Sequence, residues 1–88
     1  MWKVNIKRKL QRKIESLPGN VQSLFADLKM DLEHDGPEQP GWPNYSKLGR
    51  KKYHCHLNYH YAACWTVNDD KNLILEVYYV GSRENAPY

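Results

Sequence analysis

The first apolar residues of the chain alternate with polar ones, and this period of two predicts a short strand near residues 2–7. The apolar positions then change to helical spacing, at Leu10, Ile14 and Leu17, which predicts a helix near residues 8–17. The chain is therefore expected to begin with a strand that leads directly into a helix.

A second helix is predicted from Pro18 onward. Proline suits the first turn of a helix because its missing N–H needs no partner there. The apolar residues that follow share one helical face, since they are spaced i, i+3, i+4, i+7 and i+11: Val21, Leu24, Phe25, Leu28 and Leu32. The segment Asp35-Gly36-Pro37 predicts the end of this helix, because Gly36 permits a left-handed cap and Pro37 cannot continue a helix.

Prolines and glycines are frequent over residues 36–52 and predict a loop, which Trp42 and Tyr45 are expected to hold against the body of the protein. From residue 53 the period is two again, which predicts a strand with two different faces. One face carries Tyr53, Cys55 and Leu57, and the other carries His54, His56 and Asn58.

Two further strands are predicted, over residues 61–67 and 73–80, and the Asn and Asp residues at 68–72 predict a turn between them. The resulting order, β-α-α-β-β-β, predicts an α+β fold with an N-terminal strand, a helical hairpin and a three-stranded antiparallel meander. The hairpin is expected to pack on one face of a mostly antiparallel sheet. A chain of 88 residues has room for one domain, over residues 1–88.

Charge is unevenly distributed along the chain, although the net charge is only +3. Basic residues gather before the first acidic residue and again before the histidine strand: Lys3, Lys7, Arg8, Lys9, Arg12 and Lys13, then Lys47, Arg50, Lys51 and Lys52. Such segregation favours a polyanionic partner, because it raises the potential on one face. Two ordinary solvated faces are the alternative interpretation.

The sequence also suggests where the protein acts. No apolar run approaches the roughly 20 residues that span a bilayer, and the start Met1-Trp2-Lys3-Val4 lacks the order of a secretory signal. We therefore expect a cytoplasmic protein with no membrane role. Cys55 and Cys64 are expected to be thiols there, although neighbouring strands leave a disulfide between them conceivable.

His54 and His56 are the first candidates for chemistry. Their shared strand face places the two imidazoles about 7 Å apart, a spacing at which they can flank one phosphodiester. One imidazole would accept a 2′-hydroxyl proton while the other, protonated, steadies the phosphate or protonates the leaving oxygen. Exposed strand histidines without a function are one alternative. A zinc site with Cys64 or His60 is another, but no spaced cluster completes a tetrahedral set, so we expect no metal and no cofactor.

The C-terminal tail supplies two more candidates. Gly81 lets the backbone bend after the last strand. Arg83 presents a planar fork that matches phosphate oxygens and suits a pentavalent phosphorane. Tyr88 is suited to stack on a base or donate a proton, and a frayed terminus without a role is the alternative for this residue.

These segments together resemble the RelE/ParE superfamily of bacterial toxins, and the RelE-like ribonuclease branch in particular. The resemblance covers nearly the whole chain in element order. It is most specific in Leu48 followed by Tyr53-His54-Cys55-His56-Leu57, in Tyr61-Ala62-Ala63-Cys64-Trp65-Thr66-Val67-Asn68-Asp69-Asp70, and in Tyr79-Val80-Gly81-Ser82-Arg83-Glu84.

The resemblance implies a function and a set of site residues. The alternating basic residues of the family fall on His54 and His56, its tail arginine on Arg83 and its terminal catalytic tyrosine on Tyr88. It implies a metal-independent endoribonuclease that cleaves messenger RNA, typically in the A site of the small ribosomal subunit, by 2′-hydroxyl attack that leaves a cyclic phosphate. It also implies a cognate antitoxin protein as partner. Trp2 and the basic first helix would then contact either ribosomal RNA or that antitoxin.

One position departs from the family pattern. Many members carry an arginine directly after the aromatic residue that starts the second strand of the trio, and this chain has Ala62 there. The phosphate clamp would then rest on Arg83, with Lys47, Arg50, Lys51 and Lys52 as further RNA-binding candidates. The departure keeps open a ParE-like toxin that inhibits DNA gyrase, and a non-catalytic nucleic-acid-binding module. Histidines turned under the helical hairpin would exclude the nuclease.

Overall fold

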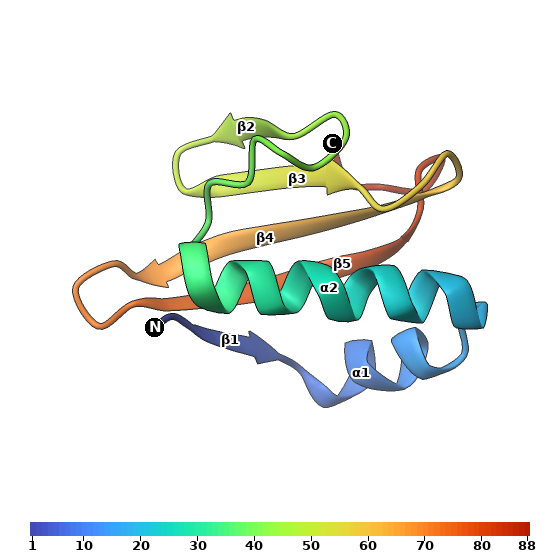
Figure 1. The fold of residues 1–88 in the computed structure, drawn as a ribbon, viewed down its shortest axis with the longest axis horizontal. Helices are drawn as coiled ribbons and strands as arrows, with labels where there is room; N and C mark the ends of the chain where they lie inside the picture. Colours follow the sequence, from blue (N-terminus) through green and yellow to red (C-terminus); the bar gives the residue numbers. More distant parts are fainter.

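A single twisted sheet and two helices make up the computed structural model, which describes residues 1–88 (Figure 1). The elements follow in the order β1 Lys3–Ile6, α1 Arg8–Glu15, α2 Gly19–Asp35, β2 Ser46–Gly49, β3 Lys52–His56, β4 Tyr61–Asp69 and β5 Ile74–Ser82. The predicted α+β fold is confirmed, with both helices and all four expected strands close to their predicted places. Neither helix is long and apolar enough to cross a membrane.

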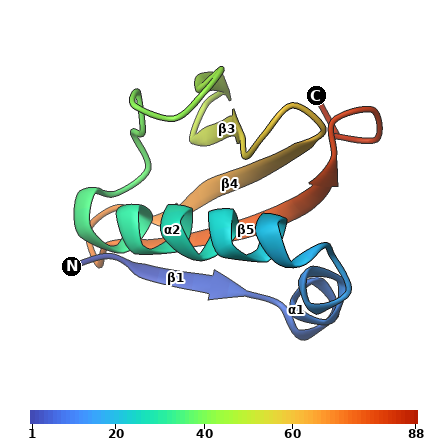
Figure 2. The ribbon, with the colours of Figure 1, turned by 45° about the vertical axis from the view of Figure 1, so that its right-hand side comes forward.

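The sheet has five strands in the order β1-β5-β4-β3-β2. The strands from β2 to β5 pair antiparallel with their neighbours, and β1 joins the edge of β5 as a parallel strand. The two helices form the connection between β1 and the rest of the sheet. In Figures 1 and 2, α2 runs along one face of the sheet and α1 lies beyond the end of β1. The opposite face is therefore free of helices.

The hydrophobic core lies between α2 and the sheet. The predicted apolar stripe of α2 faces inward, and Leu28 and Leu32 are fully buried. They pack in one cluster with side chains from β3, β4 and β5, including Tyr53, Trp65 and Val77. Burial of each large apolar side chain contributes about 1.5–3 kcal/mol. The core thus fixes which side chains of β3 point toward α2. Because side chains alternate along a strand, it also fixes which ones point to the opposite face of the sheet.

Strand β2 lies within residues that the sequence predicted as a loop. The prolines of this stretch end at Pro43, so the backbone N–H groups of Ser46–Gly49 remain available for pairing with β3. The strand is short, and its register shifts between Lys47 and Gly49. Such a bulged edge strand has no clear period of two in its sequence.

The rest of this segment is held down as expected. The indole N–H of Trp42 donates to a carboxylate oxygen of Asp31 on α2, at 2.8 Å. Tyr45 packs against both Tyr53 and Trp65, with ring centroids 6.3 Å from each. The loop is thus attached to the core at two points before β2 begins.

The two cysteines lie on opposite faces of the sheet and are free thiols. Residues paired across antiparallel strands point to the same face, and Cys55 is paired with Ala63 on the core face, whereas Cys64 is paired with His54 on the other. A disulfide between them would have to pass through the sheet. Burial raises the pKa of Cys55 to about 12 and that of Cys64 to about 11, so both thiols keep their protons.

Candidate active site

Strand β3 turns His54 and His56 to the face of the sheet that no helix covers. Its other residues, Tyr53 and Cys55, enter the core below α2, as does Leu57 just after the strand, so alternation places the two imidazoles on the far side. The ring centroids of His54 and His56 lie 5.7 Å apart, edge to face. The shared face predicted from the sequence is therefore observed, and the histidines do not lie under the helical hairpin.

The C-terminal tail covers these histidines and brings Tyr88 to them. After β5 the chain bends back, so that its end lies near β3 and the β3–β4 connection (Figure 2). The hydroxyl of Tyr88 lies 3.4 Å from Nε2 of His56, and its ring centroid lies 4.2 Å from that of His54. The last residue is half-exposed yet packed on both candidate bases, which gives it a defined place in the site.

Arg83 borders the same site from the side of the β3–β4 connection. Its backbone N–H donates to the carbonyl of His60 at 2.9 Å, and its Nη1 donates to the carbonyl of Tyr59 at 2.6 Å. A hollow of about 740 Å³ is lined by His56, Arg83 and Tyr88 together with Tyr59 and His60. Three of the four candidate catalytic residues thus line one open depression, and the fourth, His54, lies behind them against His56 and Tyr88.

The surroundings lower the pKa of both histidines. Burial is the main cause for each, because it disfavours the charged imidazolium. The positive charge of Arg83 lowers the pKa of His56 further, and His54 adds a smaller effect of the same sign. Burial also raises the pKa of the Tyr88 phenol. At neutral pH the site therefore holds two neutral imidazoles and a protonated phenol beside a guanidinium.

Ser46 of β2 fixes the orientation of one imidazole. Its hydroxyl lies 3.0 Å from Nδ1 of His54, because residues 46 and 54 are direct partners across the β2–β3 pair. The hydrogen bond occupies one ring nitrogen and aims the ring at Tyr88. Sequence reasoning did not identify Ser46, since the partner of a bulged edge strand is fixed only by the folded register.

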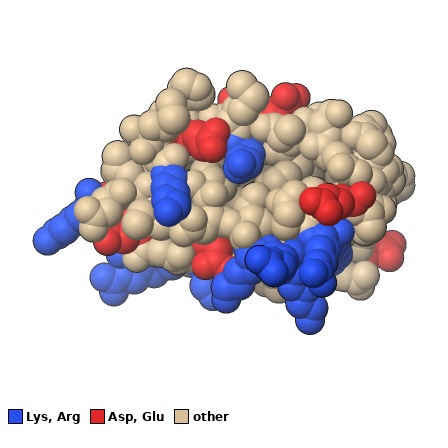
Figure 3. Space-filling view, turned by 90° about the horizontal axis from the view of Figure 1, so that it is seen from below, with Lys and Arg blue, Asp and Glu red and all other residues tan.

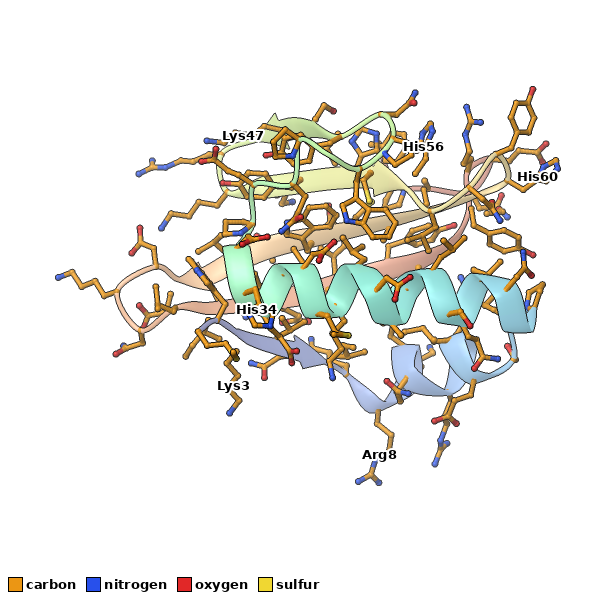
Figure 4. All side chains as sticks on the ribbon, in the orientation of Figure 1. Lys3, Arg8, His34, Lys47, His56 and His60 are labelled. Atoms are coloured by element: carbon orange, nitrogen blue, oxygen red, sulfur yellow. The ribbon has the colours of Figure 1, made fainter.

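The predicted RNA-binding residues are divided between two faces. Lys52 shares the histidine face, where its Nζ lies 6.0 Å from the centroid of the Tyr78 ring. Lys47 instead lies over Tyr53 on the α2 side, at 5.7 Å, and Lys51 is 3.9 Å from a carboxylate oxygen of Asp70. Figure 4 shows Lys47 at the end of the sheet away from His60.

Lys47 and Lys51 line a second hollow that also contains acidic residues of the α2 end, Asp35 and Glu38. Arg50 is exposed in the turn between β2 and β3. The structure thus brings Lys52 to the candidate catalytic residues and leaves the other three of this group elsewhere.

Ala62 is fully buried directly opposite His56 in the β3–β4 pair. An arginine here would project beside the histidines, whereas the methyl group of alanine supplies no charge. Arg83 is accordingly the cation that lines the hollow.

No group of three or more His, Cys, Asp or Glu side chains is placed to hold a metal ion. Cys64 is fully buried next to His54 and keeps its proton, while His60 is exposed on the hairpin connection. The donors proposed for zinc from the sequence do not converge.

A basic surface lies apart from this site, along β1 and α1. Seen from below the view of Figure 1, Lys and Arg side chains gather over this side of the molecule (Figure 3). The exposed residues that form it are Lys3, Lys7, Arg8, Lys9, Arg12 and Lys13. Trp2 is not a free surface residue, because it packs against the core and its backbone N–H donates to the carbonyl of Glu33 at 2.8 Å.

No protein-family model and no curated protein sequence matches the chain. Solved structures do match it over almost its whole length. The archaeal RelE–RelB complex of Pyrococcus horikoshii has a chain that superimposes with a TM-score of 0.75 at 17% identity, covering 97% of this chain and 98% of that one. The fold is that of the RelE toxins.

Two further structures agree with this assignment. The isolated RelE toxin of E. coli matches with a TM-score of 0.74 at 14% identity, over 99% of this chain and 89% of that one. A chain of the YoeB–YefM complex of Staphylococcus aureus matches with a TM-score of 0.71 at 12% identity, over 94% and 98%. At these identities the likeness to RelE and YoeB structures concerns the fold alone, so the chemistry has to be argued from the site.

Proposed function

We propose that this RelE-like chain is the toxin of a toxin–antitoxin system and acts as a metal-independent endoribonuclease on messenger RNA. The observation that supports it most is the meeting of Tyr88 with His54 and His56 beside Arg83, on the sheet face that no helix covers. A general base, a general acid and a phosphate-binding cation are the groups that phosphodiester cleavage by a neighbouring hydroxyl requires.

In the proposed reaction the 2′-oxygen of the RNA attacks the adjacent phosphorus. Neutral His56 accepts the 2′-hydroxyl proton, and its lowered pKa keeps it in the basic form at neutral pH. Arg83 leaves the carbonyl of Tyr59 and binds the phosphate oxygens as negative charge builds on them. The phenol of Tyr88 protonates the departing 5′-oxygen. The products are a 2′,3′-cyclic phosphate and a 5′-hydroxyl end.

This assignment changes the role expected for the second histidine. The sequence suggested that one imidazole would act while protonated, but burial disfavours the imidazolium of both His54 and His56. Burial raises the pKa of Tyr88, so the phenol keeps its proton at neutral pH and is the group with a proton to donate. His54, held by Ser46 and packed against the tilted ring of Tyr88, positions the phenol.

The proposed partners are a cognate antitoxin and messenger RNA in the A site of the small ribosomal subunit. The second partner would place the protein in the cytoplasm. RelE of Pyrococcus horikoshii and YoeB of Staphylococcus aureus are each found in complex with a second protein, RelB and YefM respectively. The basic surface on α1 suits either ribosomal RNA or an acidic antitoxin segment. One surface cannot hold both, so its occupation by the antitoxin would itself neutralise the toxin.

Ala62 supports a second candidate function. The absence of a guanidinium opposite His56 is compatible with a ParE-like toxin that inhibits DNA gyrase and does not cleave RNA. That function requires none of the residues around the hollow.

Induced expression with mapping of RNA 5′ ends distinguishes these functions. The nuclease predicts new 5′-hydroxyl ends at defined codons, which disappear in His56→Ala and Arg83→Ala. His34→Ala is the control, because His34 is exposed at the far end of α2 (Figure 4). Growth arrest with DNA breaks and intact messenger RNA would instead identify the gyrase inhibitor. Unchanged toxicity in both site variants, with folding verified by circular dichroism, would contradict the nuclease.

A further inference from the structure

We propose that Tyr59 and His60, on the β3–β4 connection, form a stacking platform for one nucleobase of single-stranded RNA. The inference rests on the proposed function, because the base belongs to an RNA whose scissile phosphate lies at His56 and Arg83. Its site is the outer part of the hollow already described.

Tyr59 is unusually exposed for a large aromatic residue of this chain. It is 79% exposed, whereas the tyrosines on the strands are buried or half-buried. The ring of His60 packs against it at 5.1 Å between centroids, with the planes 84° apart. Tyrosine presents an apolar ring and a polar tip, and therefore suits a surface that stays wet until a ligand stacks on it.

Hydrogen bonds hold this platform rigid before any ligand arrives. The side-chain oxygen of Asn58 accepts bonds from the backbone N–H groups of His60 and Tyr61, at 2.8 and 2.9 Å. The N–H of Leu57 donates to the carbonyl of Tyr61 at 2.8 Å and closes the hairpin. Binding of a base therefore costs little conformational entropy of the backbone, and the affinity is higher than it would be for a mobile loop.

The platform is also fixed relative to the candidate catalytic residues. The backbone N–H of Arg83 donates to the carbonyl of His60, a bond that the proposed reaction leaves intact. Before a phosphate binds, the guanidinium lies 5.4 Å from the centroid of the Tyr59 ring. His60 lies just beyond the end of β3 that carries His56 (Figure 4). A phosphate bound between His56 and Arg83 therefore leaves a neighbouring base within reach of Tyr59.

The class of ligand follows from the chemistry of stacking. Every base has a π-face, so an aromatic platform holds any unpaired base and contributes affinity and register, with little discrimination among sequences. A paired base is inaccessible to such a platform. The structure thus assigns to the β3–β4 connection the selection of single-stranded RNA at the cleavage position.

Binding of an uncleavable RNA tests the platform separately from catalysis. The probe is a fluorescent single-stranded hexanucleotide with 2′-fluoro sugars, which lacks the attacking hydroxyl. By fluorescence anisotropy, Tyr59→Ala and Tyr59→Leu should each raise the Kd by about 5- to 100-fold, the loss of one stacked base. Tyr59→Phe keeps the ring and should stay within about twofold of the wild type. His34→Ala serves as the matched surface control.

An abasic scan identifies the base concerned. Removing one base of the probe should weaken binding to the wild type by the same factor as Tyr59→Ala, and should have no further effect on that variant. The platform would be overturned if the wild type bound no probe, or if Tyr59→Ala had an unchanged Kd. It would also be overturned if the effect of removing a base added to that of Tyr59→Ala at every position of the probe. Parallel cleavage assays on messenger RNA bound to ribosomes separate the two proposals: binding of the probe without cleavage of this messenger RNA refutes the nuclease, and cleavage with an unchanged probe Kd in Tyr59→Ala refutes the platform.

Discussion

Tyr88 contacts both histidines at once: its hydroxyl lies 3.4 Å from Nε2 of His56, and its ring lies 4.2 Å from that of His54. A terminal residue normally frays, because few contacts repay the entropy of ordering it. Here the ring contact with His54 and the polar contact with His56 act on one side chain. The tail therefore packs against the candidate site, and substitutions can separate the contact of the Tyr88 hydroxyl from that of its ring.

Tyr88→Phe tests the role of the hydroxyl. The ring still packs against His54, so the site keeps its shape, but no proton donor faces the leaving oxygen. We expect single-turnover RNA cleavage to slow by about 10²-fold, as for loss of one general acid. Deletion of Tyr88 should slow cleavage at least as much. Equal rates for the wild type and both variants would show that the last residue is only a tail.

Arg83→Gln tests the electrostatic link between Arg83 and His56. Cleavage should fall by about 10²- to 10³-fold, because a cation that stabilises the phosphorane is lost. The pH profile should change as well. The guanidinium lowers the pKa of His56. The imidazole therefore stays neutral down to a pH below about 6.5, the usual pKa of histidine.

In the wild type the rate should rise with pH through the lowered pKa of His56 and then become level. Without Arg83 the imidazole protonates more readily, and the rising limb should move to higher pH. His34→Gln is the control, since His34 is exposed at the far end of α2 and has no place in the proposed proton transfers or in RNA binding. If the pH–rate profile of Arg83→Gln keeps the midpoint of the wild type, the charge of Arg83 does not influence the pKa of His56.

The sequence predicted the faces of β3 well, because one apolar face is enough to fix alternation. Tyr53 and Cys55 must enter the core, so His54 and His56 had to share the opposite face. Nothing in the pattern shows where a tail goes after the last strand. The contact of Tyr88 with these histidines was expected only from the resemblance to RelE-like toxins, and it depends on the path that the chain takes after Gly81.

The edge of the sheet was less predictable. The face of Lys47 follows from its pairing with Tyr53, and that register shifts within β2. The four basic residues between positions 47 and 52 therefore lie apart in space, although they are close in sequence. Lys52 is on the histidine face and Lys51 is beside Asp70. Tyr59 was overlooked for a different reason: a single aromatic residue in a turn has no period, and only its exposure next to Arg83 identifies it.

Ser46→Ala tests whether the edge strand orients His54. The substitution removes the hydroxyl that lies 3.0 Å from Nδ1 and leaves the backbone pairing of β2 intact. We expect kcat for RNA cleavage to fall by about 2- to 10-fold, the usual effect of one hydrogen bond. KM should change little. Ser46→Thr should restore the rate because it retains a hydroxyl, while Ser23→Ala, on the exposed side of α2, should match the wild type. A kcat for Ser46→Ala equal to that of the wild type would argue that His54 is held by Tyr88 alone.

Gly36→Ala tests how the end of α2 is attached to the first strand. Gly36 has φ +85°, and an added Cβ would lie 2.6 Å from Nε1 of Trp2. The strained backbone alone should lower the free energy of unfolding by about 1–3 kcal/mol, and displacement of the Trp2 indole adds to that loss. Gly41→Ala is the matched control, because no atom lies within 4 Å of its added Cβ, and it should change stability by less than about 0.5 kcal/mol. Urea unfolding followed by tryptophan fluorescence measures both variants. Equal midpoints would mean that neither the positive φ of Gly36 nor its contact with Trp2 contributes measurably to the stability of the fold.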